Sequence, residues 1–390
     1  MSMNEFLNVF RREIQRMTSR RIYFVACVVL PIFSLVFMTT IFGNGQMQNL
    51  PVGVVDDDYT SLSRNIIRMV DATPELEVTR RFANETEARN AIKRKEIYGY
   101  LHIPTGFSQK TGNNEPTTIC YYYHNAMLSV GGELHSTFET LLDEVSVTPI
   151  VTEAIGLGEG ETSITSFLMP VSELKFPTYN DTRNYTIYLT QPFFFVLLQI
   201  LLLLVTTYAL GSENKFGTSD EWLETAEGNI SIALLGKLLP YTLIFIIMGI
   251  LANIVFFEWM KMPISCSLWT MNGVTVLFIM ATQGLALSLY SIFPALSLII
   301  SAVSMVGSLG ATLSGVTFPV QFMDTPVYMA SFLFPVRHFT EVVQSLLYLD
   351  GSFGDYWTNL VAFLIFLLLP ILLLPRLKNA LTNHQYDTIE

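Results

Sequence analysis

Long apolar runs alternate with charged blocks along this chain, and the pattern indicates helices that cross a membrane. Six runs are each near the roughly 20 residues that an α-helix needs to cross about 30 Å of hydrocarbon. Because the backbone must satisfy its own hydrogen bonds in lipid, we expect each run to be helical. The six expected spans are residues 22–42, 187–210, 232–257, 268–292, 296–316 and 357–374.

The segment ahead of the first span, residues 1–21, has its own pattern. Phe6, Phe10 and Ile14 recur at helical spacing, and the arginines lie mostly on other faces. This favours an amphipathic helix that lies on the membrane surface. A plain polar tail that only orients the protein is the alternative. Since no small-residue cleavage site follows the first span, we interpret residues 22–42 as a retained signal anchor.

Basic residues near the span ends predict the orientation of the chain. Five arginines precede the first span, which places the N-terminus in the cytoplasm. Arg376 and Lys378 agree with a cytoplasmic tail over residues 377–390. Residues 211–231, here named the acidic loop, should then be cytoplasmic, although they hold only Lys215 against five acidic residues. We expect these acidic residues to bind a partner protein.

Residues 43–186 form a large polar block that this topology places outside the cytoplasm. Short apolar runs alternate with helical patterns there, as in a small α/β layer domain. The fold class that we predict is therefore an α-helical membrane protein with six spans plus re-entrant helices, and an α/β extracytoplasmic domain inserted between spans one and two. The remaining spans lie in residues 187–376. The expected strands are residues 51–56, 76–82, 97–103 and 117–123, with helix caps at Asp58 or Thr60 and at Asn84 and a long helix over residues 127–155.

Composition agrees with a membrane protein and excludes other classes. The chain has 390 residues, of which 51% are hydrophobic and 14% are charged, whereas soluble domains carry about 25% charged residues. No Lys/Arg-rich run with interleaved aromatics supports nucleic-acid binding. The net charge of −11 averages over compartments and identifies no partner. Cys27, Cys120 and Cys266 are far apart and show neither a disulfide framework nor metal spacing.

Two features of the polar block offer chemistry that has an ordinary structural alternative. The carboxylates of Asp56, Asp57 and Asp58 suit a cation such as calcium, but the later ligands and glycine of an EF-hand loop are absent. A strand end followed by a helix cap accounts for the same residues. The run from Tyr121 to His124 suits either a binding face or a strand with alternating aromatic burial. We expect no metal site.

The acidic loop predicts a short amphipathic helix at the cytoplasmic mouth. Thr218 or Ser219 can cap it, and acidic residues occupy its first turn, where the helix dipole favours them. Gly228 ends it, and its apolar side carries Trp222 and Leu223.

No segment of the chain reads as a phosphate loop, which must end in Gly-Lys-Ser/Thr. Gly217 is followed by Thr218, and the pair Gly236-Lys237 is followed by leucine inside an apolar run. The sequence therefore predicts no means of hydrolysing ATP. We expect this chain to bind no cofactor.

The acidic loop resembles a segment of the permeases of type-two ATP-binding-cassette exporters. That family carries a Glu-containing, Gly-Thr-centred loop ahead of a Leu-rich span, and the segment is the coupling helix that docks on the ATPase subunit. The resemblance implies that an ATPase subunit is a partner and that ATP and magnesium bind to it. The residues to which it assigns coupling are Glu213, Gly217, Thr218, Glu221, Trp222 and Leu223.

A second match to the same family follows the fifth expected span. The family shows a Gly-x-x-x-Pro turn and then a Pro-centred pair of short helices that re-enter the membrane from outside, here residues 319–352. Asp324 or Thr325 can cap the first helix, with Pro326 at its first position. Charged side chains here would be costly facing lipid, so they should face protein, headgroups or water. The residues concerned are Pro319, Pro335, Arg337, His338 and Glu341.

The fifth expected span carries a stripe of small residues at steps of four and three. Close helix packing is the ordinary interpretation, and the sharper one is that the stripe faces a subunit interface or the substrate path. Gln199, Asn253 and Gln283 are the deepest polar residues of other spans, and we expect each to bond a neighbouring helix. The stripe consists of Ser297, Ser301, Ser304, Ser308, Ala311 and Gly315.

We therefore predict the permease subunit of an ATP-driven exporter in the bacterial inner membrane, of the subgroup with a large first external domain. It would pair with a second permease chain, as a homodimer or heterodimer, contact membrane lipid and export an amphipathic drug, lipid or peptide. A periplasmic adaptor protein is a further partner to consider.

An ATPase-independent receptor or scaffold, phage-adsorption-like, with the same topology is the alternative, and it would have no need of the coupling residues. An ion-coupled secondary transporter is disfavoured because no Asp or Glu lies mid-span and no inverted repeat is evident. A membrane enzyme is disfavoured because no nucleophile–base pair is evident in the sequence.

Overall fold

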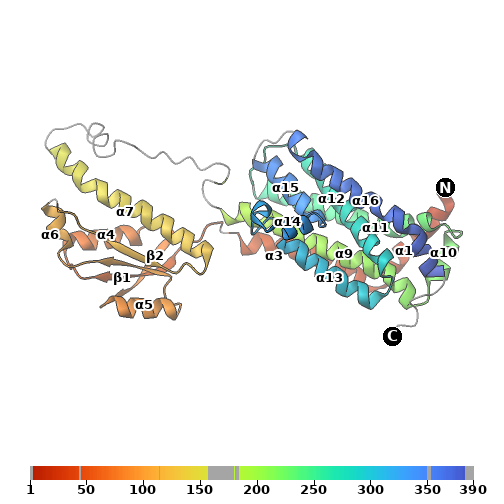
Figure 1. Ribbon diagram of the computed structural model, residues 1–390, viewed down its shortest axis with the longest axis horizontal. Helices are drawn as coiled ribbons and strands as arrows, with labels where there is room; N and C mark the ends of the chain where they lie inside the picture. The colour runs from red at the N-terminus through yellow and green to blue at the C-terminus, as the bar shows by residue number, and fades with distance from the viewer. Residues whose placement is uncertain are drawn as a thin grey trace. The chain divides into compact units, whose positions relative to one another are not determined.

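The computed structural model describes residues 3–43, 45–113, 115–156, 180, 184–348 and 353–382. The chain divides into two compact units (Figure 1). One, the polar unit, is Asn44–Thr182. The other, the membrane unit, combines Met1–Gly43 with Arg183–Glu390.

The membrane unit is helical, and five helices of the described residues are long and apolar enough to cross a membrane. These are Arg21–Ile41, Thr186–Lys215, Ile230–Trp259, Leu268–Ile292 and Gly354–Thr382. The elements are α1 (Met3–Ser19), α2 (Arg21–Phe24), η1 (Val25–Val29), α3 (Leu30–Ile41), η2 (Thr186–Thr190), α9 (Gln191–Lys215), α10 (Ser219–Thr225), α11 (Ile230–Ile254), η3 (Val255–Trp259), α12 (Leu268–Ile292), α13 (Leu296–Thr312), η4 (Val320–Phe322), α14 (Thr325–Ser331), α15 (Pro335–Tyr348) and α16 (Phe353–Thr382).

The clearest differences from the expected boundaries are at three helix ends. The expected fifth span ends early, because α13 stops at Thr312 and the chain then turns through Gly315, whose φ is +83°. Its 17 residues give a length of about 25 Å at about 1.5 Å per residue. The second span continues as helix to Lys215 instead of ending at residue 210, and α16 continues to Thr382, into the expected tail. Residues 349–352 of the re-entrant segment and residues 383–390 of the tail lie outside the described residues.

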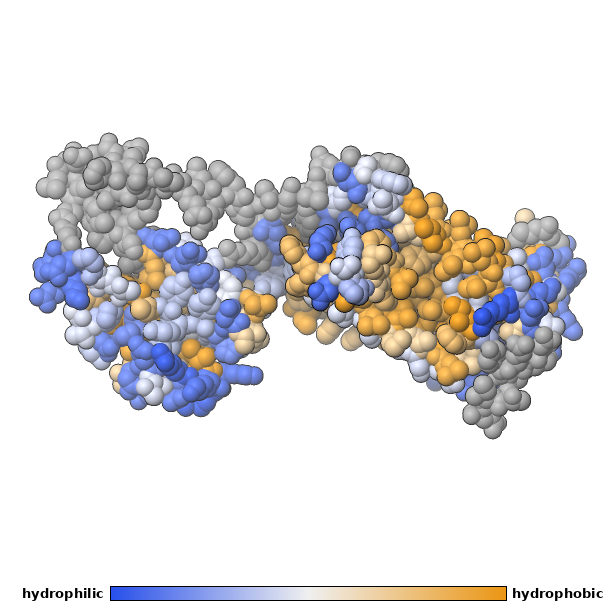
Figure 2. Space-filling view, viewed as in Figure 1, coloured by the Kyte–Doolittle hydropathy of each residue, from blue (hydrophilic) through white to orange (hydrophobic). Residues whose placement is uncertain are grey.

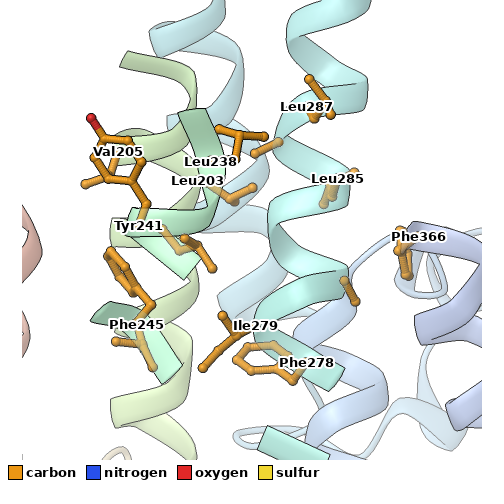
Figure 3. Close-up of a cluster of buried hydrophobic side chains, with 14 of the residues drawn as sticks. Leu203, Val205, Leu238, Tyr241, Phe245, Phe278, Ile279, Leu285, Leu287 and Phe366 are labelled. Atoms are coloured by element: carbon orange, nitrogen blue, oxygen red, sulfur yellow. The ribbon is translucent and has the colours of Figure 1, made fainter. Parts of the chain in front are cut away.

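Helix α12 lies at the centre of the membrane unit and packs against α9, α11, α15 and α16. Its Phe278 ring lies 4.4 Å from the ring of Phe339 on α15, centroid to centroid. Figure 3 shows Phe245 of α11 and Ile279 of α12 among the side chains of the same buried cluster. A β-carbon at Gly284 would lie 2.3 Å from the Phe366 carbonyl oxygen, so only glycine lets α16 approach α12 this closely.

Exposed aromatic side chains mark one end of the membrane-spanning helices. Trp259 ends the α11–η3 helix, while Trp269 and Trp357 lie near the starts of α12 and α16, and all three are exposed. Tryptophan is enriched at the membrane–water interface. The surface between the ends of the helices is largely hydrophobic (Figure 2). These features suit a multi-pass membrane protein.

The two chain segments that border the polar unit lie side by side within the membrane unit. The hydroxyl of Thr186, at the start of η2, donates a hydrogen bond to the carbonyl oxygen of Phe42, just after α3. The chain therefore leaves and rejoins the helices at neighbouring points.

The polar unit is a small α/β domain, as the alternation of patterns predicts. Its described residues form a four-stranded sheet in the order β2-β1-β3-β4, in which β1 pairs parallel with β2 and β3, and β3 pairs antiparallel with β4. Helix α5 packs on one face of the sheet, and α4 and α7 pack on the other (Figure 1). The elements are β1 (Leu50–Asp56), α4 (Ser61–Asp71), β2 (Leu76–Phe82), α5 (Glu85–Lys93), β3 (Gly99–Ile103), α6 (Phe107–Gly112), β4 (Cys120–Tyr123) and α7 (Leu128–Gly156).

Candidate functional site

The acidic loop forms a tight turn and a short helix, and two glycines shape it. Gly217 has a φ of +64° and follows the end of α9, where few residues other than glycine fit. The next backbone N–H, that of Thr218, bonds the Glu213 carbonyl at 2.9 Å. Gly228 has a φ of +73°, and its N–H bonds the Leu223 carbonyl at 2.9 Å. Both glycines satisfy helix-end carbonyls that would otherwise lack partners.

Glu213 lies inside the protein and meets three cationic side chains. Arg12 approaches one carboxylate oxygen to 2.8 Å, and Lys237 approaches the same oxygen to 2.6 Å. Arg16 also forms an ion pair with Glu213. The hydroxyl of Thr218 donates to the other carboxylate oxygen. Because α9 continues through Glu213 and buries it, this side chain is not part of the exposed surface of the acidic loop.

A second carboxylate balances this cluster. Glu13 of α1 is buried, and its Oε2 lies 2.6 Å from the Nζ of Lys237. The hydroxyl of Tyr241 donates to the Oε1 of Glu13 at 2.5 Å. Buried charges are costly unless they are paired and hydrogen-bonded, and these are both. We name the set Arg12, Glu13, Arg16, Glu213, Lys237 and Tyr241 the buried ion network.

The network joins α1 to α9 and α11. Helix α1 lies so close to α11 that a β-carbon at Gly236 would fall 2.9 Å from the side chain of Val9. Burial by itself would lower the pKa of the Arg12 guanidinium, but its hydrogen bond to Glu213 and the charge of that carboxylate outweigh burial and raise the pKa. Arg12 therefore stays charged where it meets Glu213.

Residues Met3–Ser19 form a helix, α1, as their spacing predicts, and α1 packs on the protein mainly through a side other than the apolar stripe of Phe6, Phe10 and Ile14. Val9, Glu13 and Met17 are buried, whereas Leu7 and Ile14 stay exposed. The arginines do not all point away, because long arginine side chains can lay their stems along apolar surface and carry the charge to a distant partner. Apolar periodicity cannot detect a buried glutamate whose partner lies on another helix.

Helix α10 has an inner apolar side and an outer acidic side. Trp222 and Leu223 are buried, as predicted. The indole N–H of Trp222 donates to the Ala233 carbonyl at 3.3 Å, and its ring lies 5.3 Å from the ammonium of Lys237. Glu221 is 69% exposed and lies 3.4 Å from Arg12. The other exposed acidic residues of the loop are Asp220, Glu224 and Glu227.

Helix α15 buries Arg337 and His338 against protein, as the cost of exposing them to lipid predicts, and leaves Glu341 partly exposed. His338 lies 2.7 Å from the Asn359 side chain of α16 and 3.1 Å from the Phe332 carbonyl. Arg337 lies 3.9 Å above the centre of the Phe332 ring and pairs with Glu341 at 3.3 Å. As expected, Pro335 starts α15, and Pro319 lies directly before η4.

The deep polar residues of the spans bond neighbouring elements, as expected. The Gln199 side chain of α9 accepts from the backbone N–H of Val336 at 2.9 Å. Asn253 donates to Thr275 at 3.0 Å. Thr242 donates to Gln283 at 2.5 Å.

The serines of the small-residue stripe on α13 face away from the rest of the chain. Ser297, Ser301, Ser304 and Ser308 are exposed, and Ala311 and Gly315 are partly exposed. The opposite face of α13, with Gly307 and Gly310, is the buried one. The four serines therefore do not serve packing within the described part of this chain, whereas Ala311 contacts the core.

The candidate residues of the polar unit have structural partners. The Asp56 carboxylate accepts from Ser63 at 2.9 Å, and that of Asp58 accepts from Thr60 at 2.6 Å. The Asp57 carboxylate lies 3.0 Å from His102. Within the residues that the structure describes, no group of three or more His, Cys, Asp or Glu side chains could hold a metal.

Sequence reasoning missed most of the buried ion network. Of its members, the sequence motifs assign a role only to Glu213, and Lys237 stands in the Leu-rich span that follows the acidic loop. The available signal was Lys237 itself, since an ionisable residue inside an apolar run needs a partner. Nothing in the sequence identifies that partner.

A comparison of the sequence with protein-family models agrees with a multi-pass membrane protein. A family model described as "ABC-2 family transporter protein" matches residues 21–374. The matched range includes the acidic loop and α15, but begins after α1. No curated protein matches the sequence.

Proposed function

Because this chain belongs to the ABC-2 transporter family, we propose that it is the permease subunit of an ATP-driven exporter. Members of the family are membrane components of transport systems and usually work with an ATP-binding ATPase partner. The partner binds ATP and magnesium and supplies the energy. This chain supplies the pathway, as a homodimer or a heterodimer with a related permease.

The observation that carries the proposal is the two-sided character of α10. Its outer side presents exposed acidic residues to a partner, and its inner side is fixed by Trp222 to α11. The buried ion network lies directly beneath it, since Lys237 contacts both Trp222 and Glu213. A displacement of α10 is therefore passed to α1, α9 and α11 together. Helix α10 is in this way the coupling helix.

The exposed serines of the small-residue stripe on α13 also fit a permease that is driven by an ATPase. ATP binding closes the two ATPase subunits, moves both coupling helices and changes the packing of the membrane helices. Helix α13 packs against α9, while its exposed serine face is free to meet a second permease chain or an amphipathic substrate. A drug, a lipid or a peptide has the amphipathic chemistry that this polar stripe in an apolar helix suits.

The proposed topology places α10 and both termini in the cytoplasm and the polar unit outside a bacterial inner membrane. Five arginines ahead of the first span support it. The exposed tryptophans lie at the opposite ends of the spanning helices from α10. The large first external domain and a periplasmic adaptor belong to this proposal, as do α14 and α15 as re-entrant helices and α13 as a sixth span.

Charge reversal on α10 tests the docking role. Glu224→Lys reverses an exposed charge that is not part of the buried ion network, so the folded permease should persist. Like charges brought together at an interface cost several kcal/mol, so recruitment of the co-expressed ATPase and export should both fall. Glu258→Lys, which reverses an exposed acid at the far end of the α11–η3 helix, is the matched control.

Two results would contradict the proposal. One is wild-type ATPase recruitment by a Glu224→Lys, Glu227→Lys double variant. The other is full export after residues 216–229 are replaced by a Gly/Ser linker. The second result would instead favour an ATPase-independent receptor or scaffold of the same topology.

A further inference from the structure

An apolar groove of about 460 Å³ runs between α11, α12 and α16. It lies within the size range of about 300–1,000 Å³ that is typical of small-molecule sites. Its walls are leucine and isoleucine side chains, among them Leu235, Leu239, Leu368 and Ile371. These four are exposed by 37–57%. The groove is therefore open to the surroundings of the spanning helices.

The geometry of α12 and α16 creates the groove. The two helices approach closely at Gly284, which leaves no room for a side chain beside the Phe366 carbonyl. Beyond this contact, Pro370 interrupts the hydrogen bonds of α16, and the space opens to Leu287 and Leu374. Among the described residues, Gln283 is the only amide side chain that lines the groove, and it is bonded to Thr242 and to the Leu238 carbonyl. The side chains of Thr242 and Gln283 are therefore already hydrogen-bonded within the protein.

One end of the groove is polar and basic. Ser231, in the first turn of α11, lines it there. Just past Leu374, Arg376 is exposed and donates to the Ile292 carbonyl at the end of α12, at 3.2 Å. Lys378 is exposed one half-turn further along α16. This is the end from which α10 leads into α11.

We propose that the groove holds one acyl chain of an anionic phospholipid, with its headgroup phosphate at Arg376 and Lys378. The walls match an acyl chain because each buried CH₂ contributes about 0.8 kcal/mol. A basic residue near the membrane surface attracts anionic lipid by about 1 kcal/mol. Arginine adds geometric specificity because its planar fork can hold a phosphate with two parallel hydrogen bonds.

The site is separate from the proposed transport pathway. Its lining shares no residue with the serine stripe of α13 or with the buried ion network. Ser231 and Leu238 nevertheless lie on the helix that carries Lys237. A bound lipid would therefore stabilise the packing of α11 against α16 beside the coupling helix. It is a resident lipid and not cargo.

A matched pair of tryptophan variants on α16 tests the site. Leu368→Trp fills the groove, whereas Leu364→Trp adds the same side chain one turn away, at a residue of similar exposure that does not line it. The full-length protein in detergent would be titrated with phosphatidylglycerol and observed by native mass spectrometry. We expect one tightly bound lipid per chain, at least tenfold weaker binding to Leu368→Trp, and wild-type binding to Leu364→Trp.

The headgroup is tested by charge removal and a second lipid. Arg376→Gln with Lys378→Gln should abolish the preference for phosphatidylglycerol over phosphatidylethanolamine and leave residual acyl binding. A second groove-filling pair, Leu239→Trp against Leu243→Trp, repeats the comparison on α11 in case Leu368→Trp does not fold. Equal effects within both pairs would show only non-specific annular lipid and overturn the proposal. Crosslinking of the groove to another protein's span instead of lipid would overturn it as well.

Discussion

The ammonium group of Lys237 lies 2.6 Å from a carboxylate oxygen of Glu213 and 2.6 Å from one of Glu13, and all three side chains are essentially inaccessible. One lysine thus joins the last turn of α9, the second turn of α11 and the middle of α1. Its position beneath Trp222 places this junction directly under α10.

Lys237→Met should destabilise the membrane unit strongly. The substitution removes the ion pair that Lys237 makes with the buried Glu13, and removing one member of a buried ion pair costs about 3–5 kcal/mol. The measurement is the fraction of monodisperse protein that survives a temperature series in detergent. Lys215→Met removes an exposed charge at the end of α9 and should shift the curve little. Equal curves for the two variants would contradict a structural role for the ion pair.

Gly284→Ala should disrupt the α12–α16 contact. The added methyl would meet a backbone carbonyl at 2.3 Å, which cannot rotate away, and overpacking of this kind costs about 1–3 kcal/mol or more. Gly273→Ala, on the same helix, meets open space and should be neutral or stabilising, because alanine favours a helix over glycine by about 1 kcal/mol. Thermal unfolding of the two variants, side by side, gives the comparison.

Gly217→Ala should weaken coupling more than a simple surface change would. Its φ of +64° costs a non-glycine residue about 1–2 kcal/mol, although a β-carbon there meets no atom within 4 Å. Backbone strain, and not collision, is therefore the cause. Gly217→Asn should recover part of the loss, since asparagine tolerates left-handed backbone. ATPase stimulation by substrate in a reconstituted complex is the readout, and an alanine variant with full stimulation would refute the requirement.

Cysteine labelling with an impermeant reagent tests the topology. In a background without the three native cysteines, a probe at Asn113 should react in intact cells, and one at Glu224 should react only after permeabilisation. Glu224 is chosen because it is exposed, whereas Ser219 is 2% exposed and would resist labelling on either side. The reverse pattern would place α10 outside and exclude the proposed docking.

Asp58 should make the polar unit sensitive to acid. Partial burial would raise the pKa of its carboxyl, but hydrogen bonds from Ser108 and Thr60 outweigh burial and lower it. A lowered folded-state pKa contributes stability at pH values above the unfolded-state pKa of about 4, and this contribution is lost as the pH falls through the folded-state value. Asp58→Asn should therefore reduce the loss of stability of the polar unit as the pH falls. The measurement is hydrogen exchange of α4 between neutral pH and pH 3.

Local patterns predicted the polar unit well because its elements are set by local chemistry. Thr60 and Asn84 are found as helix caps, each accepting from a backbone N–H three residues later. All four expected strands form, with starts that differ by at most three residues from those expected. Helix α6 was not expected, and its start at Gly106, with a φ of +75° and no side-chain cap, offers little local signal.

The buried ion network could not be predicted in the same way. Arg12 and Glu213 are 201 residues apart, and Glu13 and Lys237 are 224 apart, so no window of sequence contains both partners. The serine stripe shows a related limit. The spacing of the small residues identifies one face of α13. Which face of α13 packs against the other helices depends instead on Gly307 and Gly310, on the opposite side, which fit against α9 and its neighbours.

The hydrogen bond between Thr186 and the Phe42 carbonyl holds together the two points at which the chain leaves and rejoins the membrane unit. Because these two points are neighbours, the membrane helices hardly restrict the length of the segment between Phe42 and Thr186. Insertion, replacement or removal of a domain is best tolerated where the ends already meet. The membrane unit can thus accept different domains at this junction while α10 and the buried ion network stay unchanged.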